Sequence, residues 1–172
     1  KTFDQLKLEI ISKLGENIQL RRVSSLQGGY FGAYTHGSSL GAVVQIDKND
    51  PELARDLAMH ITALRPQALS ESDLDKEVLA KERKIHVEQA SNLDKPAEIV
   101  EKIISGKMAR FINEITLLGQ KFVKDPDVTI AQLLEQKGAK VMSFVCYKLA
   151  EGIEKQETDF AAEVAAQLQD SK

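Results

Sequence analysis

Apolar residues recur every three or four positions in several stretches of the chain, which is the spacing of one face of an α-helix. The first stretch ends at Leu14, and Gly15 follows at the position just past a helix C-terminus. Another begins at Asp50-Pro51, a capping residue followed by proline in the first turn. Thr129 and Gly138 bound a shorter stretch in the same manner. The pattern predicts helices over residues 3–14, 51–64, 70–90, 97–105, 107–118 and 130–137.

Other stretches have the composition and alternation that are typical of β-strands. Residues 30–36 and 40–46 flank the turn residues Gly37-Ser38-Ser39 and predict a β-hairpin. Residues 18–26 predict a further strand, although Arg21-Arg22 interrupts its apolar alternation and is expected on a solvated face.

The last part of the chain adds a loop, a strand and a helix. Residues 119–127 contain Asp125-Pro126 and predict a loop. Residues 141–149 are apolar on both faces, so that we expect this strand to lie centrally in its sheet. After Gly152, Thr158 is a candidate cap for a C-terminal helix.

Residues 70–106 differ from the rest because their apolar positions are sparse between many charges. A turn cluster at 91–96 separates two helical stretches, and Gly106 closes the second. The spacing predicts an antiparallel helical hairpin that protrudes from the main core by roughly 30 Å. The predicted class is therefore α+β: an antiparallel sheet packed with helices, this protruding arm and a C-terminal helix.

Composition narrows the class of protein. The 172 residues carry 23 basic and 26 acidic side chains, for a net charge of −3, and contain no Trp. This balance argues against a nucleic-acid partner. No apolar run approaches the ~20 residues that span a bilayer, so no membrane partner is expected. The single Cys146 excludes an intrachain disulfide and indicates a reducing compartment, the cytoplasm.

Candidate chemistry is sparse. Nucleotide-binding loops, metal-binding pairs and nucleophile elbows are absent from the sequence, which predicts no enzyme activity, cofactor or metal. Cys146 lies mid-strand, where cysteine is usually a small buried hydrophobe. His60 and His86 lie on separate predicted helices without a third ligand. His36, at the hairpin tip, is either a solvated turn residue or a binding residue. We expect a protein that binds other proteins.

Several motifs, in order along the chain, resemble the bacterial elongation factor Ts family. The resemblance covers essentially all 172 residues. Its motifs are Gly15-Glu16-Asn17-Ile18, Tyr34-Thr35-His36-Gly37, Ala58-Met59-His60-Ile61, Leu118-Gly119-Gln120-Lys121-Phe122-Val123 and Glu151-Gly152-Ile153-Glu154-Lys155.

The resemblance implies a guanine-nucleotide exchange factor that promotes GDP release from elongation factor Tu by distorting its phosphate loop and magnesium site. It also implies three regions: a remnant of a first core subdomain at 1–27, a second core subdomain at 28–150 with a coiled-coil arm at about 70–106, and a C-terminal helical module at 151–172. The family's N-terminal domain and its Thr-Asp-Phe-Val-Ala-Lys motif do not precede Lys1, so that we expect a C-terminal fragment.

Five residues carry over from the family as partner-binding residues. Leu14 and Gly15 match positions that pack against the switch helix of Tu, and His36 matches a histidine near its phosphate loop. Asp159 and Phe160 belong to the module that contacts the GTPase domain. The alternative is a scaffold fragment that forms a homodimer through the arm or the sheet and has no exchange activity.

Overall fold

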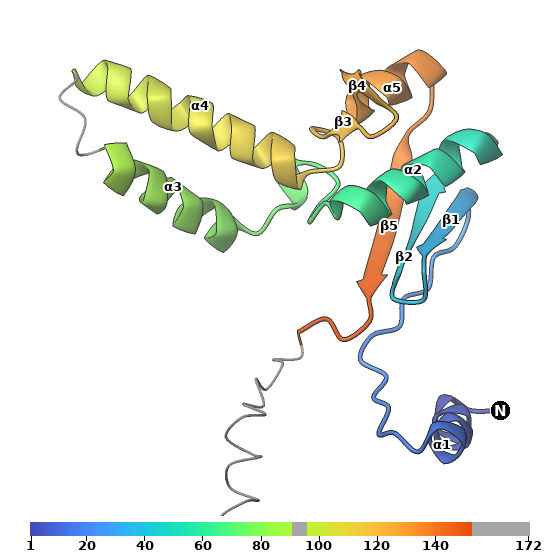
Figure 1. Cartoon of the computed structure of the whole chain (residues 1–172). Coiled ribbons are helices and arrows are strands. Elements are labelled where there is room, and N and C mark those ends of the chain that lie inside the picture. The colour runs from blue at the N-terminus through green and yellow to red at the C-terminus, as the bar shows by residue number, and fades with distance from the viewer. Residues whose placement is uncertain (91–95, 153–172) are drawn as a thin grey trace, which may run out of the picture.

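The structure, a computed structural model, describes residues 1–90 and 96–152 and combines helices with antiparallel sheets (Figure 1). This architecture confirms the α+β class. In chain order the elements are α1 (Phe3–Leu14), β1 (Tyr30–His36), β2 (Leu40–Ile46), α2 (Pro51–Leu64), the 3-10 helix η1 (Glu71–Asp73), α3 (Lys76–Ala90), α4 (Ala97–Ile115), β3 (Lys121–Phe122), β4 (Asp125–Thr129), α5 (Ile130–Lys137) and β5 (Val141–Lys148).

The larger sheet has the strand order β1-β2-β5, and both pairs are antiparallel. The predicted β1–β2 hairpin is therefore confirmed, but the central position of 141–149 is wrong, because β2 lies in the middle and β5 at an edge. The apolar pattern of β5 has another cause. Phe144 and Cys146 pack against the core, whereas Tyr147 on the opposite face lies beneath the guanidinium of Arg22.

Helix α2 packs across one face of this sheet and forms the centre of the core. Leu57 and Ile61 are fully buried. The helix approaches β1 so closely that a Cβ at Gly32 would lie 2.2 Å from the backbone of Ala54. The predicted start of α2 is confirmed, since the Asp50 side chain accepts a hydrogen bond from the backbone N–H of Leu53 at 3.0 Å.

Helices α3 and α4 run antiparallel and project away from the sheet as an arm (Figure 1). Arg83 pairs with Glu101 across the two helices at 2.6 Å. The predicted break at Gly106 is wrong: α4 continues through it to Ile115. Gly106 has open space around it, and a glycine inside a helix costs only about 1 kcal/mol, which the flanking turns outweigh.

The arm's first helix also starts later than the pattern predicted. The capping box of Ser70 with Asp73 begins the short η1 rather than α3, which starts at Lys76. The predicted turn cluster between the two helices lies largely outside the described residues.

Two further predictions need correction. Residues 18–26 form an irregular segment and not a strand. Just after this segment, Gln45 donates from Nε2 to the carbonyl oxygens of Gln27 and Gly28. Residues 119–127, predicted as loop, contain most of the small β3–β4 hairpin. The C-terminal helix predicted at Thr158 lies outside the described residues. Within the described part of the chain, no helix has the length and apolar character needed to cross a bilayer.

Candidate protein-binding surfaces

His36 is the last residue of β1 and lies exposed at the tip of the β1–β2 hairpin. The turn is tight because Gly37 adopts the left-handed conformation at φ 59°. The backbone N–H of Leu149 donates to the carbonyl of Ser39 at 2.7 Å and so ties the tip to the end of β5. The imidazole ring lies 6.4 Å from the ring of Tyr34, which packs against the core. The structure therefore presents His36 from a well-supported tip.

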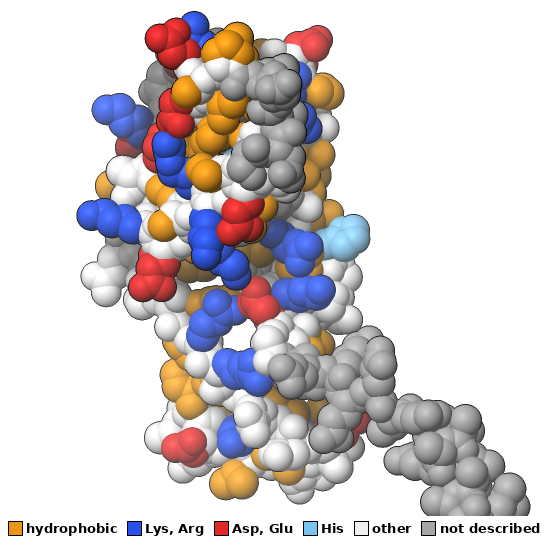
Figure 2. All heavy atoms as spheres, turned by 90° about the vertical axis from the view of Figure 1, so that its left-hand side faces the viewer, with side chains coloured by type: hydrophobic (Ala, Val, Ile, Leu, Met, Phe, Trp, Pro, Cys, Tyr) orange, Lys and Arg blue, Asp and Glu red, His pale blue; other side chains and the backbone are white. Residues whose placement is uncertain are grey.

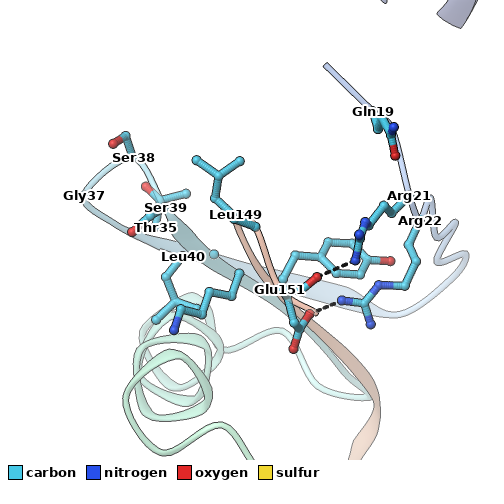
Figure 3. Close-up of a pocket in the computed structure, with 14 residues that line it drawn as sticks. Gln19, Arg21, Arg22, Thr35, Gly37, Ser38, Ser39, Leu40, Leu149 and Glu151 are labelled. Atoms are coloured by element: carbon cyan, nitrogen blue, oxygen red, sulfur yellow. Dashed lines mark hydrogen bonds and ion pairs between the residues drawn. The ribbon is translucent and has the colours of Figure 1, made fainter. Parts of the chain in front are cut away.

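A groove of about 770 Å³ lies beside this tip (Figure 3). On its far side Arg21 donates from Nη1 to the backbone carbonyl of Glu151 at 2.7 Å, and Arg22 pairs with the carboxylate of the same residue. The Arg22 guanidinium also lies 5.0 Å from the centre of the Tyr147 ring. The two arginines are exposed, as predicted, but they also link the irregular segment at residues 18–26 to Glu151, just past the end of β5.

Leu14 and Gly15 form the end of α1. Gly15 has φ 71° and donates its backbone N–H to the carbonyl of Ile11 at 2.8 Å, which confirms the predicted helix end. Leu14 is 61% exposed. Helix α1 stands apart from the sheet (Figure 1), so the structure does not bring Leu14 and Gly15 together with His36. Asp159 and Phe160 lie outside the described residues.

Most of the apolar face of α1 is exposed. No residue of this helix is buried, and five of its large apolar side chains are between 41% and 65% exposed, whereas Ile11 is half-buried; the five are Phe3, Leu6, Leu8, Ile10 and Leu14. A short helix gains most of its stability from packing of such a face. The exposed face is typical of a surface that binds another protein segment.

His60 belongs to a buried network that the sequence pattern did not reveal. Its Nδ1 accepts the backbone N–H of Val123 at 3.2 Å, and its Nε2 lies 3.1 Å from Oε1 of Gln120. Because a backbone N–H can only donate, Nδ1 carries no proton and Nε2–H donates to Gln120. Burial lowers the pKa of His60, and the hydrogen bond to Gln120 opposes this only in part. His60 is thus a neutral structural residue.

The remaining candidate chemistry is structural as well. Cys146 is half-buried, and burial, with the nearby Glu151 carboxylate, raises the pKa of its thiol, while Arg65 opposes the shift. Because its pKa is raised, the thiol stays protonated at neutral pH, and the protonated thiol is the unreactive form. Across residues 1–90 and 96–152, no cluster of three His, Cys, Asp or Glu side chains could hold a metal ion.

An exposed hairpin tip, a largely exposed amphipathic helix and a projecting helical arm define the class: an α+β module with several exposed surfaces. The sequence profile of the family described as Elongation factor TS matches residues 1–151. The chain therefore belongs to the elongation factor Ts family, which confirms the resemblance seen in its motifs.

Individual relatives agree with the family match. The chain is 51% identical to the elongation factor Ts of Aeromonas hydrophila over 92% of its own length and 54% of the relative's. It is 50% identical to that of Hydrogenovibrio crunogenus over 96% and 57% of the two lengths. It is 48% identical to that of Methylococcus capsulatus over 99% and 59%. The chain spans little more than half the length of these curated relatives.

Proposed function

We propose that this chain is a guanine-nucleotide exchange factor of translation elongation, which binds elongation factor Tu in the cytoplasm and promotes release of GDP without being an enzyme itself. The observation that carries the proposal is the family match over residues 1–151. The exposed tip supports it, because His36 matches the family histidine that lies near the phosphate loop of Tu and stands on a side of the hairpin open to a partner.

The mechanism needs no covalent chemistry. Nucleotide and exchange factor bind Tu with opposing preference, so that each weakens the other by the same coupling free energy. The factor binds the state of Tu in which the phosphate loop and the magnesium site are distorted, and GDP leaves that state faster. Each tenfold loss of nucleotide affinity needs only ~1.4 kcal/mol of differential contact, which a few side chains can supply.

The proposed contacts are distributed over the chain. His36 acts at the phosphate loop, and Leu14 with Gly15 packs against the switch helix. Asp159 and Phe160, outside the described residues, contact the GTPase domain. The corresponding division into regions is 1–27, 28–150 with the arm at about 70–106, and 151–172. An exposed helix end at Leu14 and an exposed tip at His36 support separate contacts rather than one compact site.

The test is the release of a fluorescent GDP analogue from Tu against rising concentrations of this chain. We expect acceleration, and we expect His36→Ala to reduce it about tenfold, equivalent to ~1.4 kcal/mol, while the melting temperature barely changes. Ser38→Ala, which truncates another side chain at the same tip, is the matched control and should leave the rate unchanged. Unchanged release by His36→Ala with a large loss of stability would make His36 a structural residue.

The second candidate function is a scaffold that forms a homodimer through the arm or the sheet without exchange activity. Exposed apolar side chains on the arm favour it: Ile85, Val87 and Ile99 are 38%, 44% and 45% exposed. Size-exclusion chromatography with and without Tu separates the two functions. A stable homodimer that neither binds Tu nor accelerates release would establish the scaffold.

A further inference from the structure

The outer edge of β5 borders a second, larger groove. β5 is an edge strand, and its outer edge has no backbone partner in the described part of the chain. The groove has a volume of about 1090 Å³ and runs along residues 142–148 of this strand. Residues 65–69, which follow α2, form one wall, and residues 21–24 form another. The groove thus has the length and the open strand edge to accept an extended segment.

Positive charge dominates the rim of this groove. Arg21, Arg22, Arg65 and Lys148 line it, against the acidic Asp73 and Glu151. Figure 2 views the molecule from this side and shows Lys and Arg side chains gathered around a hollow in the middle of the face.

These cations are not equally available. Glu151 already binds Arg21 and Arg22, whereas the side chains of Arg65 and Lys148 form no hydrogen bond or ion pair with a described residue. Among the described residues, these two positive charges therefore have no ion-pair partner.

Arg65 is placed at the rim by an unusual backbone conformation. It caps the C-terminus of α2 with φ 47° and ψ 60°, in the left-handed region, and its backbone N–H donates to the carbonyl of Ile61 at 2.8 Å. A glycine would adopt this conformation without strain. The arginine instead adds a charge at the groove, close enough to Cys146 to affect the pKa of its thiol.

The floor of the groove is apolar. Met142 is 57% exposed, and Phe144 and Cys146 are half-buried beside it. β5 contains no proline, and its only charged residue is Lys148 at the end. Open strand edges with apolar side chains bind extended peptides by adding a strand, in which backbone hydrogen bonds supply affinity and side-chain pockets supply specificity.

We propose that β5 binds an extended, acidic peptide segment of a partner protein, which adds to the sheet as a fourth strand. Backbone groups of the segment pair with the outer edge of β5, its carboxylates meet Arg65 and Lys148 on the face of Phe144 and Cys146, and its alternate apolar side chains lie on the opposite face, beside Val145. A second copy of this chain is a poorer occupant, because pairing two β5 edges would bring two basic rims together. This surface lies on a different strand from His36 and does not depend on the exchange activity.

The test uses the full chain and fluorescein-labelled peptides of eight residues, with binding measured by fluorescence anisotropy. One peptide alternates Glu with Val, a second alternates Lys with Val, and a third is the Glu peptide with N-methylated backbone amides along one edge. We expect the Glu peptide to bind at least about tenfold more tightly than the other two, because charge and strand pairing both contribute. Its affinity should also fall with added salt.

Variants locate the site. Arg65→Glu and, independently, Lys148→Glu should weaken binding of the Glu peptide about tenfold, whereas Arg55→Glu, an exposed change on α2 outside this groove, should leave it unchanged. Circular dichroism checks that each variant is folded. Amide hydrogen exchange should show peptide-dependent protection in β5 but not in β1.

Several outcomes would overturn the proposal. They are equal binding of the Glu and Lys peptides, undiminished binding of the N-methylated peptide, protection confined to β1 or the arm, and absence of binding. A dimer that persists when the Glu peptide is added, with β5 protected in the dimer itself, would assign the edge to a second copy instead.

Discussion

His60 lies in the middle of α2, and both of its ring nitrogens are used. Val123 donates to one, and the other donates to Gln120, whose Nε2 in turn donates to the carbonyl of Glu114 at 2.7 Å. The ring is fully buried, so each lost bond would leave a buried polar group unpaired, at about 1–3 kcal/mol. This network joins α2, the end of the arm and the β3–β4 hairpin.

We predict a pH dependence of stability that originates at His60. Burial lowers its folded-state pKa, so the unfolded chain, with a pKa of about 6.5, binds the proton more readily. The stability contributed by neutral His60 is therefore fully present above pH ~6.5 and is lost as the pH falls below that value. The measurement is the free energy of unfolding by urea between pH 5 and 8.

The comparison is made with His60→Gln, which cannot titrate. We expect it to be less stable by about 1–3 kcal/mol at pH 8 and to approach the unmodified chain as the pH falls. His36→Gln, at an exposed position, is the control and should keep the full pH dependence. An equal difference between His60→Gln and the unmodified chain at all pH values would contradict the assignment.

Local signals predicted where some candidate residues lie and missed the contacts of others. His36 was predictable because Gly37-Ser38-Ser39 marks the turn that exposes it, and Gly15 because glycine commonly follows a helix end. The contacts of Arg21 and Arg22 were not, since Glu151 is 130 and 129 residues away in the chain. The hydrogen bonds of His60 likewise join residues that are far apart in the chain, since Gln120 and Val123 are 60 and 63 residues away.

At the scale of elements, the hairpin and most helices were predictable because capping and spacing are local, but the start of α3 and the continuation of α4 through Gly106 were not. The position of β5 in the sheet was not predictable. An apolar pattern on both faces of a strand indicates that both faces are covered, but it does not identify the elements that cover them. One face meets the core, and the other lies beneath Arg22 and beside Ser24, whose side chain bonds the Tyr147 hydroxyl. The irregular segment at residues 18–26, which covers this face, was itself predicted as a strand.

A pair of glycine substitutions separates packing from helix propensity. Gly32→Ala should destabilise the chain by more than about 3 kcal/mol, because the new Cβ would meet the Ala54 backbone between β1 and α2. Gly106→Ala, in open space on α4, should stabilise that helix by about 1 kcal/mol.

Urea unfolding measures the first effect, and amide exchange along α4 measures the second. A Gly32→Ala variant as stable as the unmodified chain would mean that α2 can shift away from β1. Faster amide hydrogen exchange along α4 in the Gly106→Ala variant would mean that the arm needs a glycine at this position.

At the scale of the whole molecule, the arm lies outside the hydrophobic core. Buried residues of the arm helices are few, Ala90 and Ile104 among those described, and neither belongs to the core cluster around α2. The base of the arm, here called its root, is bonded to the core domain. The backbone N–H of Gln67 donates to the carbonyl of Ile115 at 2.8 Å, and that of Leu117 donates to the carbonyl of Ala68 at 2.9 Å. The arm is therefore separable only above this root.

We predict that replacing residues 76–111 with a short Gly-Ser linker leaves a folded chain. The core loses little buried apolar area, so that the variant should melt cooperatively, within a few degrees of the unmodified chain, in a scan followed by circular dichroism at 222 nm. A longer deletion that also removes the root through Leu117 is the contrasting variant and should abolish the cooperative transition. Loss of cooperativity in the shorter deletion would place the arm within the core.

The last prediction concerns how strongly this chain acts on Tu when compared with a longer relative. The chain covers 54% of the length of the Aeromonas hydrophila protein, and most of the apolar face of the chain's α1 is exposed. We expect contacts in the remainder of the relative to add to those proposed for His36, Leu14 and Gly15, since a domain-sized patch commonly contributes several kcal/mol, although area converts poorly into affinity. We therefore expect half-maximal acceleration of GDP release at a concentration at least about 100-fold higher than for the relative, or ~2.7 kcal/mol. The relative truncated to the matching residues is the control and should behave like this chain. Equal acceleration by the long and short forms would place the whole exchange mechanism within the residues of this chain.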